Sequence, residues 1–63
     1  MIGERIRELR ENRRWSQEFL ARRSGIDRRL ISKLETGAIK SARLEVAIKL
    51  AHAFGVSAEL LGR

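Results

Sequence analysis

The chain has 63 residues, 43% of them hydrophobic, which is enough for one compact core. It contains no cysteine and one histidine, which excludes a disulfide scaffold and a thiolate zinc site and leaves a histidine metal cluster without partners. No apolar run reaches the ~18 residues needed to cross a bilayer, and no signal-peptide pattern opens the chain. We therefore expect one soluble, cytoplasmic domain over residues 1–63, with no metal, no cofactor and no membrane partner.

The basic side chains are concentrated in the first two-thirds of the sequence. The net charge is +6. Residues 1–43 carry 12 basic and 6 acidic side chains, whereas residues 44–63 carry two of each. A domain whose cations lie in one part while the rest has no net charge is typical of proteins that bind polyanions. This distribution favours nucleic acid as the partner, and a solvated basic surface without a partner is the alternative.

The first half of the chain shows two helical segments. An apolar stripe that starts at Ile2 predicts a helix over residues 2–13. Ser16 is suited to cap a second helix that extends to about residue 24. Gly25 follows it and suits the left-handed conformation past a helix end.

The second half predicts three further helices. Asp27 is suited to cap a third helix that ends before Gly37. A fourth helix starts at about residue 41 or 43 and ends at Phe54, and Ser57 caps a final short one. No segment alternates with the period of a strand, so the fold class is all-α with five short helices. The predicted core consists of the apolar residues on these faces: Ile6, Leu9, Leu20, Ala21, Ile26, Ile31, Leu34, Leu44, Ile48, Ala51, Phe54, Val56 and Leu60.

The third predicted helix has two chemically different faces. At ~100° per residue, its apolar residues 30, 31 and 34 form a stripe roughly 100° wide. The other side offers three cations and two hydroxyls. An ordinary charged surface helix would look the same, because charged outer faces are common. The residues on this polar side are Arg28, Arg29, Ser32, Lys33 and Thr36.

The segment before this helix carries a more specific pattern. Two helices that cross steeply over a short turn need a small residue where they touch and a residue tolerant of positive φ in the turn. Ala21 and Gly25 meet these needs. Ile31 and Leu34 supply the apolar inner face of the second helix. This spacing is typical of a helix-turn-helix.

On these residues, the chain resembles the lambda-repressor-like helix-turn-helix domains of the XRE or Cro/C1 type. The similar segment runs from RIRELRENRRWSQEFLARRSGIDRRLISKLETG through LEVAIKLAHAFGVS and covers almost the whole sequence. The resemblance implies a compact five-helix domain with its helix-turn-helix at about residues 17–36. It also implies sequence-specific binding of double-stranded DNA by a transcriptional repressor or regulator, and no enzymatic activity.

The resemblance also implies roles for individual residues. Helix 28–36 is expected in the major groove, where an arginine forks onto guanine O6 and N7. The family's largely buried salt bridge matches Arg10 and Glu35. The positions that match base contacts are Arg28, Arg29, Ser32 and Lys33. The positions that match phosphate contacts are Gln17, Thr36, Lys40 and Arg43.

The expected partners are a double-stranded DNA operator and a second copy of the chain. The homodimer is expected to be weak and to form mainly on DNA, through the region around residues 55–61. No small-molecule substrate is expected. Two alternatives stay open from the residues: a designed or structural scaffold with this fold and no DNA target, and an antitoxin-type module that binds a protein partner. Trp15 and Phe19 are interpreted as packing residues rather than base-stacking ones.

Overall fold

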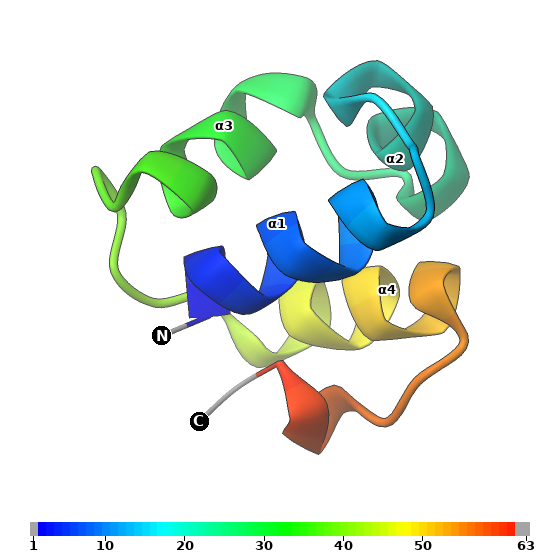
Figure 1. The fold of residues 1–63 in the computed structure, drawn as a ribbon. Helices are drawn as coiled ribbons and strands as arrows, with labels where there is room; N and C mark the ends of the chain where they lie inside the picture. Colours follow the sequence, from blue (N-terminus) through cyan, green and yellow to red (C-terminus); the bar gives the residue numbers. More distant parts are fainter. Residues whose placement is uncertain (1, 62–63) are drawn as a thin grey trace.

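The computed structural model describes residues 2–61, which form four α-helices and a 3-10 helix and contain no β-strand (Figure 1). The all-α class agrees with the sequence prediction, but the count of five helices is wrong. The last element is only a three-residue 3-10 helix, because its backbone bonds run from each residue to the third one before it. No helix within the described residues is long and apolar enough to span a membrane. The elements are α1 (Ile2–Asn12), α2 (Gln17–Ser24), α3 (Arg28–Thr36), α4 (Leu44–Phe54) and η1 (Ala58–Leu60).

Local side chains account for the limits of the helices. The Ser16 hydroxyl accepts the backbone N–H of Phe19 at 3.0 Å and so caps α2. The Asp27 carboxylate caps α3 in the same way, by accepting the N–H of Arg29 at 2.7 Å. Between α1 and α2, Arg14 adopts a φ of 58°, which a residue with a Cβ adopts at a cost. The chain therefore leaves α1 through a strained residue.

The core lies where α1 meets α3 and α4 and where α2 closes over them. Figure 1 shows α1 running between α3 and α4. Gly3 allows the close approach of α1 to α3, since a Cβ at this position would collide with the carbonyl of Leu34. The largest side chains that are fully buried are Ile6, Leu20, Ile31, Leu34, Leu50 and Leu61.

Most of the predicted core is confirmed, but three of its members are exposed. Leu44 is 73% exposed, Ile48 49% and Leu60 54%. The buried face of α4 is centred on Leu50 and Ala51, which rotates it by roughly 60° from the predicted face at ~100° per residue. At the end of η1 the chain buries Leu61, the residue after the helix, and leaves Leu60 exposed, because adjacent residues of a tight turn cannot face the same core.

The other predicted core positions divide into buried and half-buried residues. Leu9, Ala21 and Val56 are half-buried and pack against the core. The side chains confirmed as buried are Ile6, Leu20, Ile26, Ile31, Leu34, Ala51 and Phe54.

Candidate nucleic-acid interface

The turn between α2 and α3 is held by short local hydrogen bonds. The Ser24 hydroxyl donates to the carbonyl of Leu20 at 2.7 Å and accepts the N–H of Ile26 at 3.2 Å. Gly25, at φ 78°, donates its N–H to the carbonyl of Ala21 at 2.8 Å. Three residues are therefore enough to redirect the chain from α2 into α3, and Ile26 is buried below the turn. The relative orientation of the two helices is set locally.

The outer face of α3 is cationic and the inner face is anchored. Ile31 is fully buried and Leu34 is 1% exposed. Arg28, Arg29 and Lys33 are exposed. Because the inner face cannot turn outward without unburying two large aliphatic side chains, the three cations are held on the solvent side.

The remaining residues of α3 are less exposed than these cations. Ser32 is half-buried at the edge of the cationic face. Leu30 is also half-buried and packs against the core, which extends the apolar side of the helix toward its start. The four predicted base-contacting residues thus all lie on α3, with three of them fully accessible.

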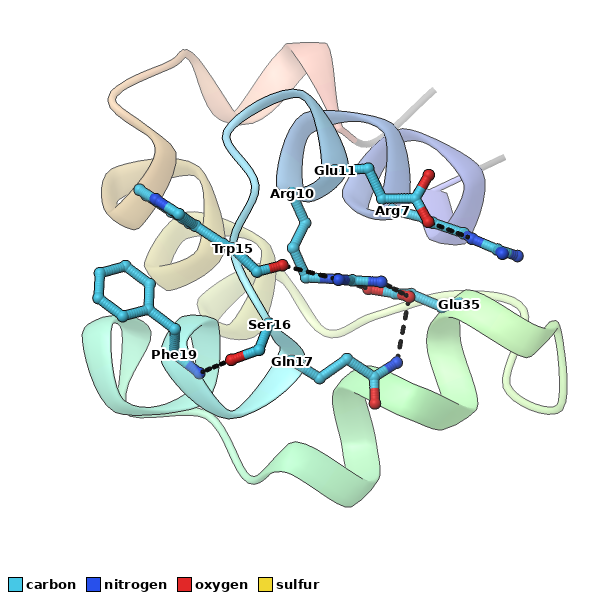
Figure 2. Close-up of polar contacts among 8 residues, drawn as sticks. All are labelled: Arg7, Arg10, Glu11, Trp15, Ser16, Gln17, Phe19 and Glu35. Carbon is cyan, nitrogen blue, oxygen red and sulfur yellow. Dashed lines mark hydrogen bonds and ion pairs between the residues drawn. The ribbon is translucent and has the colours of Figure 1, made fainter.

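A network of polar contacts joins α1, α2 and α3 behind this face (Figure 2). The Arg10 guanidinium makes two hydrogen bonds of 2.9 Å to the two oxygens of Glu35 and a third of 2.8 Å to the carbonyl of Trp15. The side-chain amide of Gln17 donates to the same carboxylate at 3.1 Å. The Arg10 side chain is 13% exposed and that of Glu35 only 4%. A buried, two-pronged pair of this kind fixes orientation more than it adds net stability.

The electrostatics of the pair agree with its geometry. The hydrogen bond to Glu35 raises the pKa of Arg10 above its ordinary value, although burial acts in the opposite direction. Gln17 is the first residue of α2, so the network holds the α2 N-terminus against α3.

A shallow hollow lies between the start of α2 and the start of α3. Its lining contains the cations Arg10 and Arg28 together with Gln17, and a neighbouring hollow along α2 is lined by Arg22 and Arg28. The acidic residue Glu18 lines both hollows. The unpaired N–H groups at a helix N-terminus and nearby cations suit a phosphate group. Arg22 was not predicted as a site residue. No sequence signal singles it out, because its spacing of four residues after Glu18 is that of an ordinary exposed ion pair on a helix.

The other predicted phosphate contacts lie at the far end of α3. The Thr36 hydroxyl donates to the carbonyl of Lys33 at 3.3 Å and accepts the N–H of Ala38 at 3.4 Å, so it shapes the helix end. Lys40 and Arg43 are exposed in the segment between α3 and α4. Within residues 2–61 their side chains make no ion pair or hydrogen bond. Cations therefore lie at both ends of α3, with Arg28 and Arg29 at its start and Lys40 and Arg43 beyond its end.

Not every arginine belongs to this surface. Arg13 donates to the carbonyls of Leu9 and Phe54 at 3.0 and 2.9 Å, and Arg23 donates to the carbonyl of Ala53 at 3.0 Å. Both guanidinium groups also lie over the ring of Trp15, at 5.7 and 5.2 Å from its centroid. These two arginines bind the last carbonyls of α4, where a cation is favoured.

The aromatic side chains form one cluster beside these arginines. Trp15 stacks on Phe54 with ring centroids 5.6 Å apart and lies 4.9 Å from Phe19. Figure 2 shows Trp15 and Phe19 next to each other on the side away from Glu35. Trp15 is thus half-buried against the core, and Phe19 is the exposed edge of the cluster.

Comparison with known proteins adds one finding to this geometry. A family model described as helix-turn-helix, of the XRE and lambda-repressor-like type, matches residues 6–61. Searches of curated proteins and of solved structures gave no match. The matched range contains α2, α3 and the turn between them, and the family is one of DNA-binding transcription regulators rather than enzymes. The chain belongs to the XRE, lambda-repressor-like family of helix-turn-helix proteins.

Proposed function

We propose that this protein binds double-stranded DNA in a sequence-specific manner as a transcriptional repressor, of the kind found in phages, in the cytoplasm. Residues 1–63 act as one DNA-binding domain with its helix-turn-helix at 17–36, and α3 enters the major groove. The observation that supports the proposal most directly is the difference between the two faces of α3. Two fully anchored aliphatic residues, Ile31 and Leu34, lie opposite an exposed row of cations.

In this proposal, four residues of α3 reach the base edges. An arginine can donate two parallel hydrogen bonds to guanine O6 and N7, so Arg28 and Arg29 favour guanine in the site. Lys33 lies one turn further along the same face and reaches the same groove. Ser32, at the edge of the face, donates or accepts a single hydrogen bond.

The phosphate contacts flank these base contacts. The α2 N-terminus, which the Arg10–Glu35 pair holds through Gln17, binds a phosphate on one side. Thr36, Lys40 and Arg43 bind the backbone beyond the other end of α3. Contacts on both sides of the groove set the register of the helix but carry no sequence information.

The proposed partner besides DNA is a second copy of the chain. Three leucine and isoleucine side chains of α4 and η1 are exposed, and one of them, Leu60, belongs to the region around residues 55–61, where pairing was expected. Three side chains offer far less than the roughly 800 Å² per partner of a stable interface. The free protein is therefore monomeric at micromolar concentration and pairs mainly when two half-sites on DNA bring two copies together. The three exposed side chains of α4 and η1 are Leu44, Ile48 and Leu60.

The test starts by selecting bound sequences from a pool of random duplexes. The wild-type protein and two variants are then titrated with the selected duplex and a scrambled one at several salt concentrations. Arg29→Ala should cost about 1–3 kcal/mol on the selected duplex, and much less on the scrambled one. Lys40→Ala should weaken both complexes equally and lower the salt slope by about one unit.

The opposite results identify the alternatives. If the wild-type protein binds both duplexes equally and with one salt slope, its surface is merely basic and the chain is a scaffold with this fold. If it binds neither duplex, the exposed apolar side chains of α4 favour a protein partner instead, as in an antitoxin-type module. Identical behaviour of Arg29→Ala and Lys40→Ala would mean that α3 does not read bases.

A further inference from the structure

One acidic side chain lies among the cations at the start of α3. Asp27 is exposed, and its Oδ1 accepts the backbone N–H of Arg29 at 2.7 Å. The same oxygen lies 3.5 Å from the Nε of the Arg29 side chain, which is itself exposed. A carboxylate at this place is unexpected on a surface for DNA, because it repels phosphate.

The contact leaves a defined part of the guanidinium available. A guanidinium donates from Nε and from two terminal nitrogens, and Asp27 lies against the Nε edge. The terminal nitrogens are the ones that fork onto guanine O6 and N7. A carboxylate at Nε therefore leaves Arg29 able to bind a guanine while its charge is partly compensated.

We propose that Asp27 is a positioning residue that directs Arg29 to guanine and away from the DNA backbone. The inference rests on the proposed DNA-binding function. Guanine presents neutral acceptors, so Asp27 can remain beside Arg29 when the base is bound, and it can also accept from the amino group of a cytosine. A phosphate that approached Arg29 would meet the Asp27 carboxylate as well. The pair thus weakens non-specific binding and strengthens the preference for G·C.

Capping alone does not account for this arrangement. Asparagine and serine cap helices about as well as aspartate does. Only a carboxylate also adds a charge beside the Arg29 guanidinium. Asp27→Asn therefore keeps the cap of α3 and removes the charge, which separates the two roles of the residue.

The experiment is a double-mutant cycle with Asp27→Asn and Arg29→Ala. The wild type, both single variants and the double variant are titrated with the selected duplex, with duplexes in which each guanine is replaced in turn, and with the scrambled duplex. Thermal melting checks that all four proteins are folded. We expect Asp27→Asn to bind the scrambled duplex about 2- to 5-fold more tightly, which corresponds to one exposed ion pair. Its salt slope there should rise by about 0.9, since Arg29 becomes free to neutralise one phosphate.

The base preference is the readout that a purely structural role would not change. Asp27→Asn should lower the preference for guanine at one position by a similar factor, and this loss should vanish when Arg29 is already alanine. Glu8→Gln is the matched control, because Glu8 is another exposed acid but pairs with Arg5 on α1, at 3.1 Å, rather than with a cation of α3. It should strengthen binding to the scrambled duplex without changing any base preference.

Two results would overturn the inference. One is an unchanged guanine preference in Asp27→Asn, with the wild-type protein still selecting its duplex, which leaves the proposed function intact. The other is an equal effect of Asp27→Asn in the presence and absence of Arg29. If the wild-type protein selects no duplex at all, the proposed function fails and the role of Asp27 falls with it.

Discussion

Two groups of arginines within residues 2–61 differ in what their guanidinium groups touch. Those behind α3 and at the end of α4 bind protein atoms: Arg10 binds Glu35, and Arg13 and Arg23 bind backbone carbonyls. Those on α3, Arg28 and Arg29, face solvent. Asp27 lies beside Arg29, and Glu18 lines the same hollows as Arg28. Net charge does not distinguish the groups. The difference shows that a basic sequence reports the number of cations, whereas their partners decide which of them can bind DNA.

Replacing the buried arginine, Arg10, should have the largest effect on the stability of the protein. Arg10→Ala should lower the free energy of unfolding by about 3 kcal/mol, because it leaves a buried Glu35 carboxylate without its cation. Arg7→Ala is the control on the same helix, since Arg7 pairs with Glu11 on the exposed side. It should cost less than about 0.5 kcal/mol. Urea denaturation followed by Trp15 fluorescence measures both, and equal losses would contradict the distinction.

The second prediction compares Arg13, which binds protein carbonyls, with Lys40, which is proposed to bind DNA. Arg13→Met should lower the free energy of unfolding by roughly 1.5 kcal/mol, because the carbonyls of Leu9 and Phe54 lose their donor. The salt slope of DNA binding should stay the same. Lys40→Met should do the reverse, with stability unchanged within about 0.5 kcal/mol and a lower salt slope. If both variants alter both properties, the two groups of cations are not distinct.

A smaller gain in stability is expected where an arginine has an unfavourable backbone conformation. Arg14 has a φ of 58°, and its side chain makes no ion pair or hydrogen bond within residues 2–61. Arg14→Gly should raise the free energy of unfolding by roughly 0.5–1 kcal/mol, since glycine adopts positive φ without strain. Arg14→Ala removes the same charge but keeps the Cβ, so it should bring no such gain. Thermal and urea denaturation of the two variants give the comparison.

The smallest effect concerns the acid among the exposed cations. The N–H of Arg29, and then its side chain, hold the pKa of Asp27 below its ordinary value of 3.8. A lowered pKa stabilises the folded state above the unfolded pKa, and this contribution is lost as the pH falls through the folded value. Asp27→Asn should therefore differ from wild type by a constant amount near neutral pH. Below pH 3.8 the difference should shrink, and thermal melting at a series of pH values measures it; parallel curves throughout would be evidence against the contact.

The helices of the first two-thirds of the chain were predictable because their signals are local. Ser16 and Asp27 cap α2 and α3 by bonds that span only two or three residues, and Gly25 ends α2 within the same short range. The predicted face of α3 is correct as well. Its apolar and charged residues separate cleanly around the helix, so only one rotation buries the first and exposes the second.

The face of α4 was not predictable in the same way. Apolar residues surround much of this helix, so several rotations bury a similar area, and the sequence analysis chose the one through Leu44 and Ile48. The packing against α2 and η1 selects another, centred on Leu50. The contacts of Arg13 and Arg23 with the carbonyls at the end of α4 were equally unpredictable, because they join residues 30 or more positions apart.

The sequence by itself determined the helical class, the approximate bounds of α2 and α3 and the cationic side of α3. These depend on periodicity, caps and charge, which act over a few neighbouring residues. Only the tertiary structure decided which cations are engaged by protein atoms, which face of α4 is buried and that Asp27 lies against Arg29 on the exposed surface. The physical reason is that these features depend on contacts between residues far apart in the sequence, which form only when the chain folds. Two arginines of the same chemistry therefore differ in function when they have different partners in the fold.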